Sequence, residues 1–312
     1  MQHFWSLEEL WLGTSWLTIG AFDGVHRGHQ QIIQQLTAGA HAAGVPAVVL
    51  TFYPHPSAVL GKRDGPFYLT TPEQRAHLLG QLGVDFVISH PFNRQVANTS
   101  AQDFMAYLVA HIHPQQLCVG YDFALGRGRE GNVERLSELG QEFDYGVHVF
   151  APVKLGGEVV SSSQIRAELT QGNVSRAAEL LGRPYSVSGV VVQGDGRGHS
   201  IGVPTANLDV WKKLVLPKPG VYACQARLQA RTYAAVTNIG YRPTFPGAPP
   251  SPQVEAHLLD FHQNVYGKQI ELFFYERLRD EQKFPSVDAL VAQIQSDIQR
   301  GREILQSVAS PP

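Results

Sequence analysis

The chain has 312 residues, 43% of them hydrophobic and 17% charged, which is typical of a globular protein of about two domains. Its net charge at pH 7 is −2, divided into −5 for residues 1–182 (11 basic, 16 acidic) and +3 for residues 183–312 (14 basic, 11 acidic), and neither value favours a nucleic-acid-binding face. No apolar run approaches the roughly 20 residues that a membrane-spanning helix needs, so we expect no membrane segment.

The first half alternates short apolar runs with helical patterns. The runs indicate buried parallel strands and comprise SWLTIG (15–20), PAVVLTF (46–52), DFVISH (85–90), QLCVGYDF (116–123) and VHVFAP (147–152). Helical spacing is found in residues 29–44, 72–83 and 100–112, where Thr71 and Pro72 mark the start of the second helix. This alternation predicts a doubly wound α/β layer, in which ligands bind beyond the carboxyl ends of the strands.

The second half changes to β-branched and aromatic runs separated by glycine and proline turns. These runs are SVSGVVVQG (186–194), GVYACQARL (220–228), RTYAAVTNIG (231–240), QVEAHLLDF (253–261) and QIELFFYERL (269–278). Since no helical pattern lies between them, they predict a small antiparallel barrel or sandwich. A final helix should carry an apolar stripe formed by Val287, Leu290, Val291, Ile294, Ile298 and Leu305. The composition changes near residues 182–186, so we expect one domain over residues 1–182 and a second over residues 183–312.

One motif, GAFDGVHRGHQQII (20–33), lies where the first strand should end and a helix begin. Its histidines, His26 and His29, are three residues apart and should share one side of the first helical turn. Glycines allow the backbone to approach a ligand, and a helix N-terminus favours an anion. The two imidazoles could therefore bind a phosphate and stabilise developing charge. A pair of surface histidines is the alternative, and a metal pair ranks lowest because no obvious third ligand is spaced with them.

Three further motifs fall at expected strand ends or helix starts of the same half. TFYPHP (51–56) ends the second strand, VGYDFALGRGREG (119–131) ends the fourth, and SSSQIR (161–166) opens a helix. Each alone could be a proline turn, a flexible loop or an ordinary helix cap. The first motif resembles the H-x-G-H signature of the nucleotidylyltransferase superfamily. All four, in this order, resemble the adenylylating module of the prokaryotic bifunctional riboflavin kinase/FAD synthetases.

The second half extends this resemblance. GDGRGHSIGVPTANLD (194–209) contains a P-T-A-N motif similar to that of riboflavin kinases, and GVYA, VTNIGYRPTF, VEAHLLDF and LRDEQKFPSVDALVAQIQSDI follow in the order of that module. The resemblance spans residues 14 to 300 or so. It implies a Rossmann-like nucleotidylyltransferase domain, then a six-stranded antiparallel β-barrel with a C-terminal helix. It also implies an enzyme that phosphorylates riboflavin to FMN with ATP and adenylylates FMN to FAD, releasing pyrophosphate, with Mg²⁺ accompanying ATP.

Residue by residue, the resemblance implies roles in adenylyl transfer, which must hold two polyanions in line and spread negative charge. His26 and His29 would stabilise that charge, and Arg166 would bind the leaving phosphates. Asp122 would contact the nucleotide, and Asp23 would orient the loop. The implied nucleotide- and flavin-binding residues of this half are Gly20, Phe22, Asp23, Gly24, Gly28, Asp122, Arg129, Ser162 and Ser163.

For riboflavin phosphorylation, the resemblance makes Glu255 the catalytic base, whereas periodicity alone favours an outward-facing strand residue. Thr205 and Asn207 offer neutral oxygens that suit Mg²⁺ together with ATP phosphates, although they could also form a proline turn. A phosphate-covering loop is implied next to them, where a hairpin turn would look much the same. The residues of this loop are Gly194, Asp195, Arg197 and Gly198.

The sequence departs from the family pattern in two places. Tyr53 stands before Pro-His-Pro where an acidic residue is common, which puts a metal or flavin role there in doubt. His199 and Val203 stand where Arg and Phe are common, and Val203 should alter packing around the flavin. We expect neither departure to abolish activity. Two rivals are an enzyme with one active module and a flavin-binding protein with inactive sites.

Cellular location and partners follow from simpler features. The opening stretch carries Glu8 and Glu9 and no basic cluster, so it does not read as a signal peptide. Cys118 and Cys224 lie in apolar runs, which favours buried thiols in a reducing compartment. We expect a cytoplasmic protein whose partners are ATP, riboflavin and FMN, with no nucleic acid or membrane. The oligomeric state stays open, a homo-oligomer included.

Overall fold

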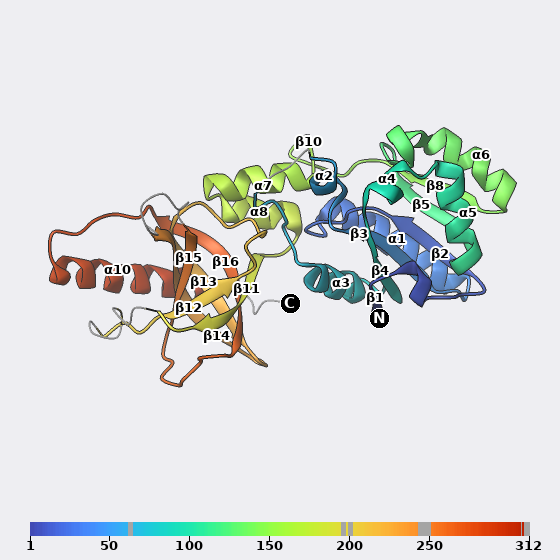
Figure 1. Ribbon diagram of the computed structural model, residues 1–312. Coiled ribbons are helices and arrows are strands. Elements are labelled where there is room, and N and C mark those ends of the chain that lie inside the picture. The colour runs from blue at the N-terminus through green and yellow to red at the C-terminus, as the bar shows by residue number, and fades with distance from the viewer. Residues whose placement is uncertain (62–64, 195–197, 199–201, 243–250, 307, 309–312) are drawn as a thin grey trace. The chain divides into compact units, whose positions relative to one another are not determined.

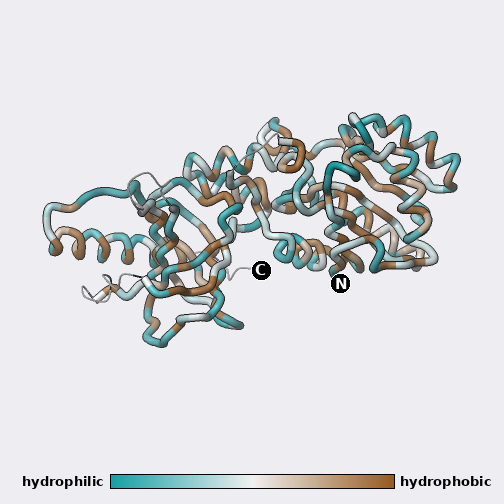
Figure 2. Tube along the Cα trace, viewed as in Figure 1, coloured by the Kyte–Doolittle hydropathy of each residue, from teal (hydrophilic) through white to brown (hydrophobic). Residues whose placement is uncertain are grey.

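The computed structural model describes residues 1–61, 65–194, 198, 202–242, 251–306 and 308 (Figure 1). Contacts along the chain divide it into two compact units, Met1–Ser162 and Ser163–Pro312. Hydrophobic residues recur along the strands of both units, where they form the cores (Figure 2). Within the described ranges, no helix combines the length and the hydropathy needed to cross a bilayer.

The first unit is built on a six-stranded sheet in which every neighbouring pair is parallel. The order is β1-β4-β3-β2-β5-β8, with bounds Gln2–Phe4 (β1), Ser15–Ile19 (β2), Ala47–Tyr53 (β3), Phe86–Pro91 (β4), Pro114–Gly120 (β5) and Gly146–Phe150 (β8). The doubly wound α/β layer is therefore confirmed. The order changes direction between β2 and β5, and such switch points are where open α/β sheets bind ligands.

Helices cover both faces of this sheet, and their bounds are Arg27–Ala42 (α1), Pro72–Gln81 (α3), Ala101–Ile112 (α5) and Val133–Phe143 (α6). Val48 and Leu50 belong to the core that includes residues of α5 and α6. Val49 belongs to the core that includes residues of α1 and α3. Because successive side chains of a strand point to opposite faces, both faces are apolar and the strand reads as a continuous hydrophobic run.

Shorter elements connect these helices and strands. Their bounds are Leu7–Glu9 (η1), Pro56–Val59 (α2), Arg94–Asn98 (α4), Ala124–Leu125 (β6), Arg127–Arg129 (η2), Gly131–Asn132 (β7), Lys154–Leu155 (β9) and Glu158–Val159 (β10). The helix start predicted at Thr71 is confirmed, since Thr71 and Gln74 cap each other reciprocally at the start of α3.

The second unit contains a closed barrel of six antiparallel strands, as the resemblance implied. The order is β11-β12-β15-β14-β13-β16, with bounds Tyr185–Val192 (β11), Ala206–Val210 (β12), Gly220–Leu228 (β13), Arg231–Arg242 (β14), Ser251–Leu258 (β15) and Gln269–Arg279 (β16). In β15, Val254, Ala256 and Leu258 are buried, whereas Glu255 and His257 are half-buried. The buried set fills the barrel, so the other two face outward.

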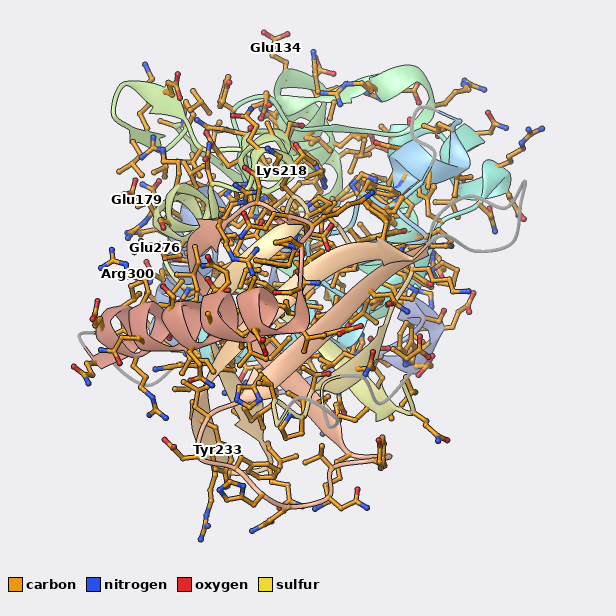
Figure 3. The ribbon with its side chains drawn as sticks, turned by 90° about the vertical axis from the view of Figure 1, so that its left-hand side faces the viewer. Glu134, Glu179, Lys218, Tyr233, Glu276 and Arg300 are labelled. Atoms are coloured by element: carbon orange, nitrogen blue, oxygen red, sulfur yellow. The ribbon has the colours of Figure 1, made fainter. Side chains whose placement is uncertain are left out.

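Three helices accompany the barrel, with bounds Ser162–Gln171 (α7), Val174–Leu181 (α8) and Val287–Gln306 (α10). The apolar stripe predicted for α10 is half-buried or buried except at Val287, which is 61% exposed at the helix start. Figure 3 shows α10 in front of the barrel strands, where Arg300 of α10 lies 3.6 Å from Glu276 of β16.

The compact units divide about twenty residues before the predicted domain boundary. Helix α8 packs against β11 and β16, and the Lys218 amide donates to the Leu169 carbonyl at the end of α7 (2.9 Å). Contacts therefore group α7 and α8 with the barrel. The assignment of one activity to residues 1–182 and the other to residues 183–312 stays a prediction.

Two candidate active sites

The first candidate site is the turn between β2 and α1, residues 20–26. Phe22 and Val25 have φ angles of 45° and 42°, a left-handed conformation that non-glycine residues seldom adopt. The Asp23 carboxylate accepts hydrogen bonds from the amides of Leu69 (2.9 and 3.1 Å) and Thr70 (3.1 Å), and from the Thr70 hydroxyl (3.2 Å). Strained backbone persists only where its surroundings fix it, and these bonds do so. The Asp23 carboxylate thus ties the turn to residues 69 and 70, and its role as a loop-orienting residue stays a prediction.

The two histidines of the motif lie together at the N-terminus of α1. His26 is the N-cap, and its Nδ1 accepts from the His29 amide (3.4 Å). The two rings stack, with centroids 3.6 Å apart and an interplanar angle of 20°. The Phe22 ring contacts His29 edge-on, with centroids 5.1 Å apart. Both imidazoles therefore share one side of the first turn, at the end of the helix dipole that favours anions.

The glycines of this motif make the close packing there feasible. A Cβ on Gly28 would lie 3.1 Å from Cε1 of His26, and one on Gly20 would lie 3.0 Å from the Phe22 ring. Gly24 has a φ of 84°, which a glycine adopts at little cost.

The other predicted residues of the first half belong to both compact units. The Ser162 hydroxyl donates to the Asp23 carbonyl (2.8 Å), so it touches the loop directly. Asp122 follows β5, the neighbour of β2, and its carbonyl accepts from Nη2 of Arg129 (2.9 Å). Two further residues, Ser163 and Arg166, belong to α7 in the second unit, where Ser163 is exposed and Arg166 half-buried.

Tyr53, a departure from the family pattern, lies at the end of β3 among aromatic rings. Its ring centroid is 6.2 Å from that of Trp5 and 6.3 Å from that of Tyr68. The Tyr68 hydroxyl accepts from the His55 amide (2.8 Å), and burial raises its pKa. This position therefore contributes an aromatic ring where the family resemblance implied a carboxylate.

Sequence reasoning missed a buried cation beneath the turn. Arg75 of α3 is fully buried, and its Nη1 donates to the Ala21 carbonyl (2.7 Å). The Thr51 hydroxyl donates to the same carbonyl (3.0 Å). Burial lowers the pKa of Arg75, against the opposing effect of the nearby Asp23 carboxylate. The sequence signal that could have found Arg75 was its place beside Ala76 on the face of α3 that is buried.

The second candidate site is a cavity of about 520 Å³ on the outer wall of the barrel. Glu255 of β15 lines it and pairs in register with Asn207 of β12 on one side and Asn238 of β14 on the other. Glu255 thus does face outward, as periodicity favoured, and it also faces a cavity. Asn238 was not predicted as a site residue, and its signal was an amide inside the apolar strand VTNIG.

A second cavity, of about 400 Å³, adjoins the first at Thr205, which lines both. It is bounded by residues 261–266 and by apolar side chains of the barrel. A Cβ on Gly194 would meet the Asn207 side chain, and one on Gly198 would lie 3.4 Å from Oγ1 of Thr205. The predicted loop glycines therefore bring the backbone close to the two predicted Mg²⁺-binding residues.

The structure describes only part of this loop, and that part includes Val203, one of the departures from the family pattern. Asp195, Arg197 and His199 lie outside the described residues. Val203 is 4% exposed and lines the larger cavity, and its amide donates to the Gly198 carbonyl (2.8 Å). A branched aliphatic side chain there leaves more room than the phenylalanine that the family resemblance implied.

Helix α10 closes one side of the larger cavity. The carboxylate of Asp297, which is 5% exposed, accepts hydrogen bonds from Nε (3.0 Å) and Nη2 (2.8 Å) of Arg279. It also accepts one from the side-chain amide of Gln293 (2.9 Å). Arg279 also lies over the Phe284 ring, 5.6 Å from its centroid. This bidentate pair fixes α10 against the barrel next to apolar cavity residues.

The two predicted Mg²⁺-binding residues offer neutral oxygens rather than charged ligands. In the described part of the chain, no group of three or more His, Cys, Asp or Glu side chains could hold a metal ion. Thr205 and Asn207 present neutral oxygens, which suit Mg²⁺ when phosphates supply its remaining ligands. The residues present thus fit an ion that arrives with ATP.

Comparison with known proteins gives a consistent picture. The family model for FAD synthetase matches residues 11–164, and that for riboflavin kinase matches residues 181–305. Relatives named bifunctional riboflavin kinase/FMN adenylyltransferase include those of Bacillus subtilis (37% identity, 91% of this chain and 90% of the relative) and Escherichia coli K12 (38%, 92% and 91%). A solved Streptococcus pneumoniae structure, named a macrolide-efflux protein, has a TM-score of 0.87 at 31% identity, covering 96% of this chain and 98% of that one.

Both family models match in the order of the two units, and these relatives align over almost their whole length. The chain therefore belongs to the bifunctional riboflavin kinase/FMN adenylyltransferases, enzymes that phosphorylate riboflavin to FMN and adenylylate FMN to FAD.

Proposed function

We propose that each reaction takes place at one of the two candidate sites: FMN adenylylation at the turn 20–26, and riboflavin phosphorylation at the cavity beside Glu255. The observation that carries the second assignment is the row formed by Asn207, Glu255 and Asn238 on three neighbouring strands. A carboxylate flanked by two amides at the wall of a cavity can take a proton from a bound hydroxyl.

In the kinase step, Glu255 accepts the proton of the ribityl 5′-hydroxyl as that oxygen attacks the γ-phosphorus of ATP. The bond from the γ-phosphorus to the bridging oxygen breaks, and ADP leaves. Thr205 and Asn207 would hold Mg²⁺, which would neutralise charge on the phosphates. Asn238 and Asn207 flank Glu255 on the two neighbouring strands.

The two adjoining cavities suit the two substrates of this step. The larger one has apolar side chains such as Val203, Phe284 and Ile294 in its wall, which suit the flavin ring. The smaller one would take the nucleoside of ATP. Thr205 lines both cavities, so phosphoryl transfer would occur at their junction, near Glu255.

In the adenylylation step, an FMN phosphate oxygen attacks the α-phosphorus of ATP and pyrophosphate leaves, so no protein nucleophile is needed. The stacked His26 and His29 spread the negative charge of the transition state, supported by the N-terminus of α1. Ser162, Ser163 and Arg166 bind the leaving phosphates. The remaining proposed contacts with nucleotide and flavin are Gly20, Phe22, Gly24, Gly28, Asp122 and Arg129 for this step, and Gly194, Asp195, Arg197 and Gly198 for the kinase step.

A pair of variants tests both assignments in one chain. We expect His29→Ala to lower FAD formation from supplied FMN by ~10²–10³ and to leave FMN formation unchanged. We expect Glu255→Gln to lower kcat for FMN formation by ~10²–10⁴ and to leave FAD formation unchanged. Each variant is incubated with ATP, Mg²⁺ and either riboflavin or FMN, and the flavins are separated by chromatography.

The outcomes also distinguish the rivals. An equal loss of both activities in either variant would contradict the assignment of that residue. If excess Mg²⁺ restored the Glu255→Gln rate, Glu255 would be a metal ligand rather than a base. Wild-type protein that makes only one product would be an enzyme with one active module.

We also propose that the enzyme works in the cytoplasm. Both cysteines are free and buried, and burial raises the pKa of each thiol to about 12. Unpaired thiols suit a reducing compartment, and ATP is supplied there.

A further inference from the structure

Arg75 presents a buried charge that packing does not explain. It is among the largest fully buried side chains of the protein. Within the described residues, Nη1 donates to Ala21, whereas Nε and Nη2 have no hydrogen-bond partner. Burying an incompletely bonded guanidinium costs stability, and an apolar side chain of similar size would cost less. A residue that is unfavourable for stability is a candidate for function.

The position of Arg75 indicates which function. The segment that ends in Arg75 also contains Leu69 and Thr70, which bind the Asp23 carboxylate. The Thr70 hydroxyl further accepts from the Gly24 amide (3.2 Å). This segment therefore holds the turn 20–26 at Ala21, Asp23 and Gly24. Arg75 makes the contact at Ala21, and among the described residues it is the one charged donor to that carbonyl.

The turn needs such support because it is strained. Phe22 comes directly after Ala21 with a φ of 45°, and Val25, with a φ of 42°, directly precedes His26. If the Ala21 carbonyl were released, the turn could relax toward ordinary backbone angles and the imidazole of His26 would shift. A misplacement of about 1 Å at a reacting group can cost ~10²-fold in rate.

We propose that Arg75 is a positioning residue for FMN adenylylation: it holds the Ala21 carbonyl, so that the strained turn keeps His26 and His29 stacked at the N-terminus of α1. This role rests on the proposed part of the two histidines in that reaction. Arg75 acts through the backbone that joins Ala21 to His26.

The test compares Arg75→Met and Arg75→Lys in the full-length chain. Methionine fills the space but cannot donate, whereas lysine keeps a charged donor. We expect Arg75→Met to lower kcat for FAD formation by ~10–10²-fold with little change in KM for FMN or ATP. We expect Arg75→Lys to recover most of that loss. The melting temperature of Arg75→Met should equal or exceed that of wild type, because a costly buried charge has been removed.

Arg135 of α6 provides a control, because its side chain is 40% exposed and pairs with Glu138. Arg135→Met should keep wild-type FAD formation, and every variant should keep wild-type FMN formation. The proposal is overturned if Arg75→Met retains the wild-type kcat, or if Arg135→Met loses as much. It is also overturned if Arg75→Met melts earlier and Arg75→Lys gives no recovery, since the role is then structural.

His29→Ala, measured alongside, separates this proposal from the one on which it rests. A wild-type rate of FAD formation in His29→Ala would show that the turn is not the adenylylation site. Loss in His29→Ala with a wild-type rate in Arg75→Met would leave the site assignment in place and refute the positioning role alone.

Discussion

Gly194→Ala should impair riboflavin phosphorylation by displacing the side chain of Asn207. The φ of Gly194 is outside the left-handed range, so alanine can adopt its backbone conformation. The added Cβ would lie 2.6 Å from Cγ and 2.9 Å from Oδ1 of Asn207, and closer still to its amide nitrogen. Ordinary van der Waals contact begins at 3.4 Å, so Cγ must retreat by the difference from 2.6 Å, about 0.8 Å. A displacement near 1 Å in a positioning group costs ~10–10²-fold in rate, or roughly 1.4–2.7 kcal/mol of activation free energy.

The assay measures initial rates of FMN formation over a range of Mg²⁺ concentrations. Because Asn207 is proposed to hold Mg²⁺, Gly194→Ala should raise the half-saturating Mg²⁺ concentration as well as lower the rate. FAD formation from supplied FMN reports on the first unit and should not change. Gly13→Ala is the matched control, since its Cβ would have nothing within 4 Å. Wild-type rate and Mg²⁺ dependence in Gly194→Ala would refute the reasoning that Asn207 must stay where it is.

Three further predictions concern the chain as a whole. A fragment of residues 183–312 should phosphorylate riboflavin. It should unfold more readily than a fragment of residues 163–312, because losing the two buried leucines of α8 removes roughly 3–6 kcal/mol of folding free energy. Equal denaturation midpoints of the two fragments would contradict this. Gly28→Ala should keep or raise the melting temperature, because alanine has the higher helix propensity. It should nevertheless lower the rate of FAD formation, because the added Cβ would displace the His26 ring. An unchanged rate would show that the added Cβ does not disturb the site. Cys118 and Cys224 should stay protonated and unreactive at pH 8, well below their raised pKa of about 12, so iodoacetamide should label them only in denatured protein, as mass spectrometry can check.

The elements that local pattern specifies were predictable, and those that depend on distant partners were not. The run at residues 46–52 became β3 because a strand buried on both faces must be apolar throughout. β1, with the sequence QHF, carries no such signal and is a strand because it pairs with β4, more than eighty residues away. β12 was hidden in the same way, since Ala206–Val210 follows a proline motif that also reads as a turn.

The same distinction between local pattern and distant partners applies to the residues of the candidate sites. The spacing of His26 and His29 fixes their common side of a helix, so their proximity followed from sequence. Asn238 joins Glu255 through strand register, which a single sequence does not encode locally. Arg75 meets Ala21 across 54 positions, and an arginine on a helix normally reads as a solvent-exposed side chain.

The filled barrel has a consequence for engineering this enzyme. Val254, Ala256 and Leu258 occupy the interior, and Glu255 and His257, from the same strand, line the outer cavity. A library that randomises position 257 and keeps Glu255, the proposed base, can therefore explore new flavin analogues while the hydrophobic core keeps its composition. A one-residue deletion within β15 would exchange the two sets, placing a carboxylate in the barrel interior and removing the base from the cavity, so it would abolish folding and kinase activity together.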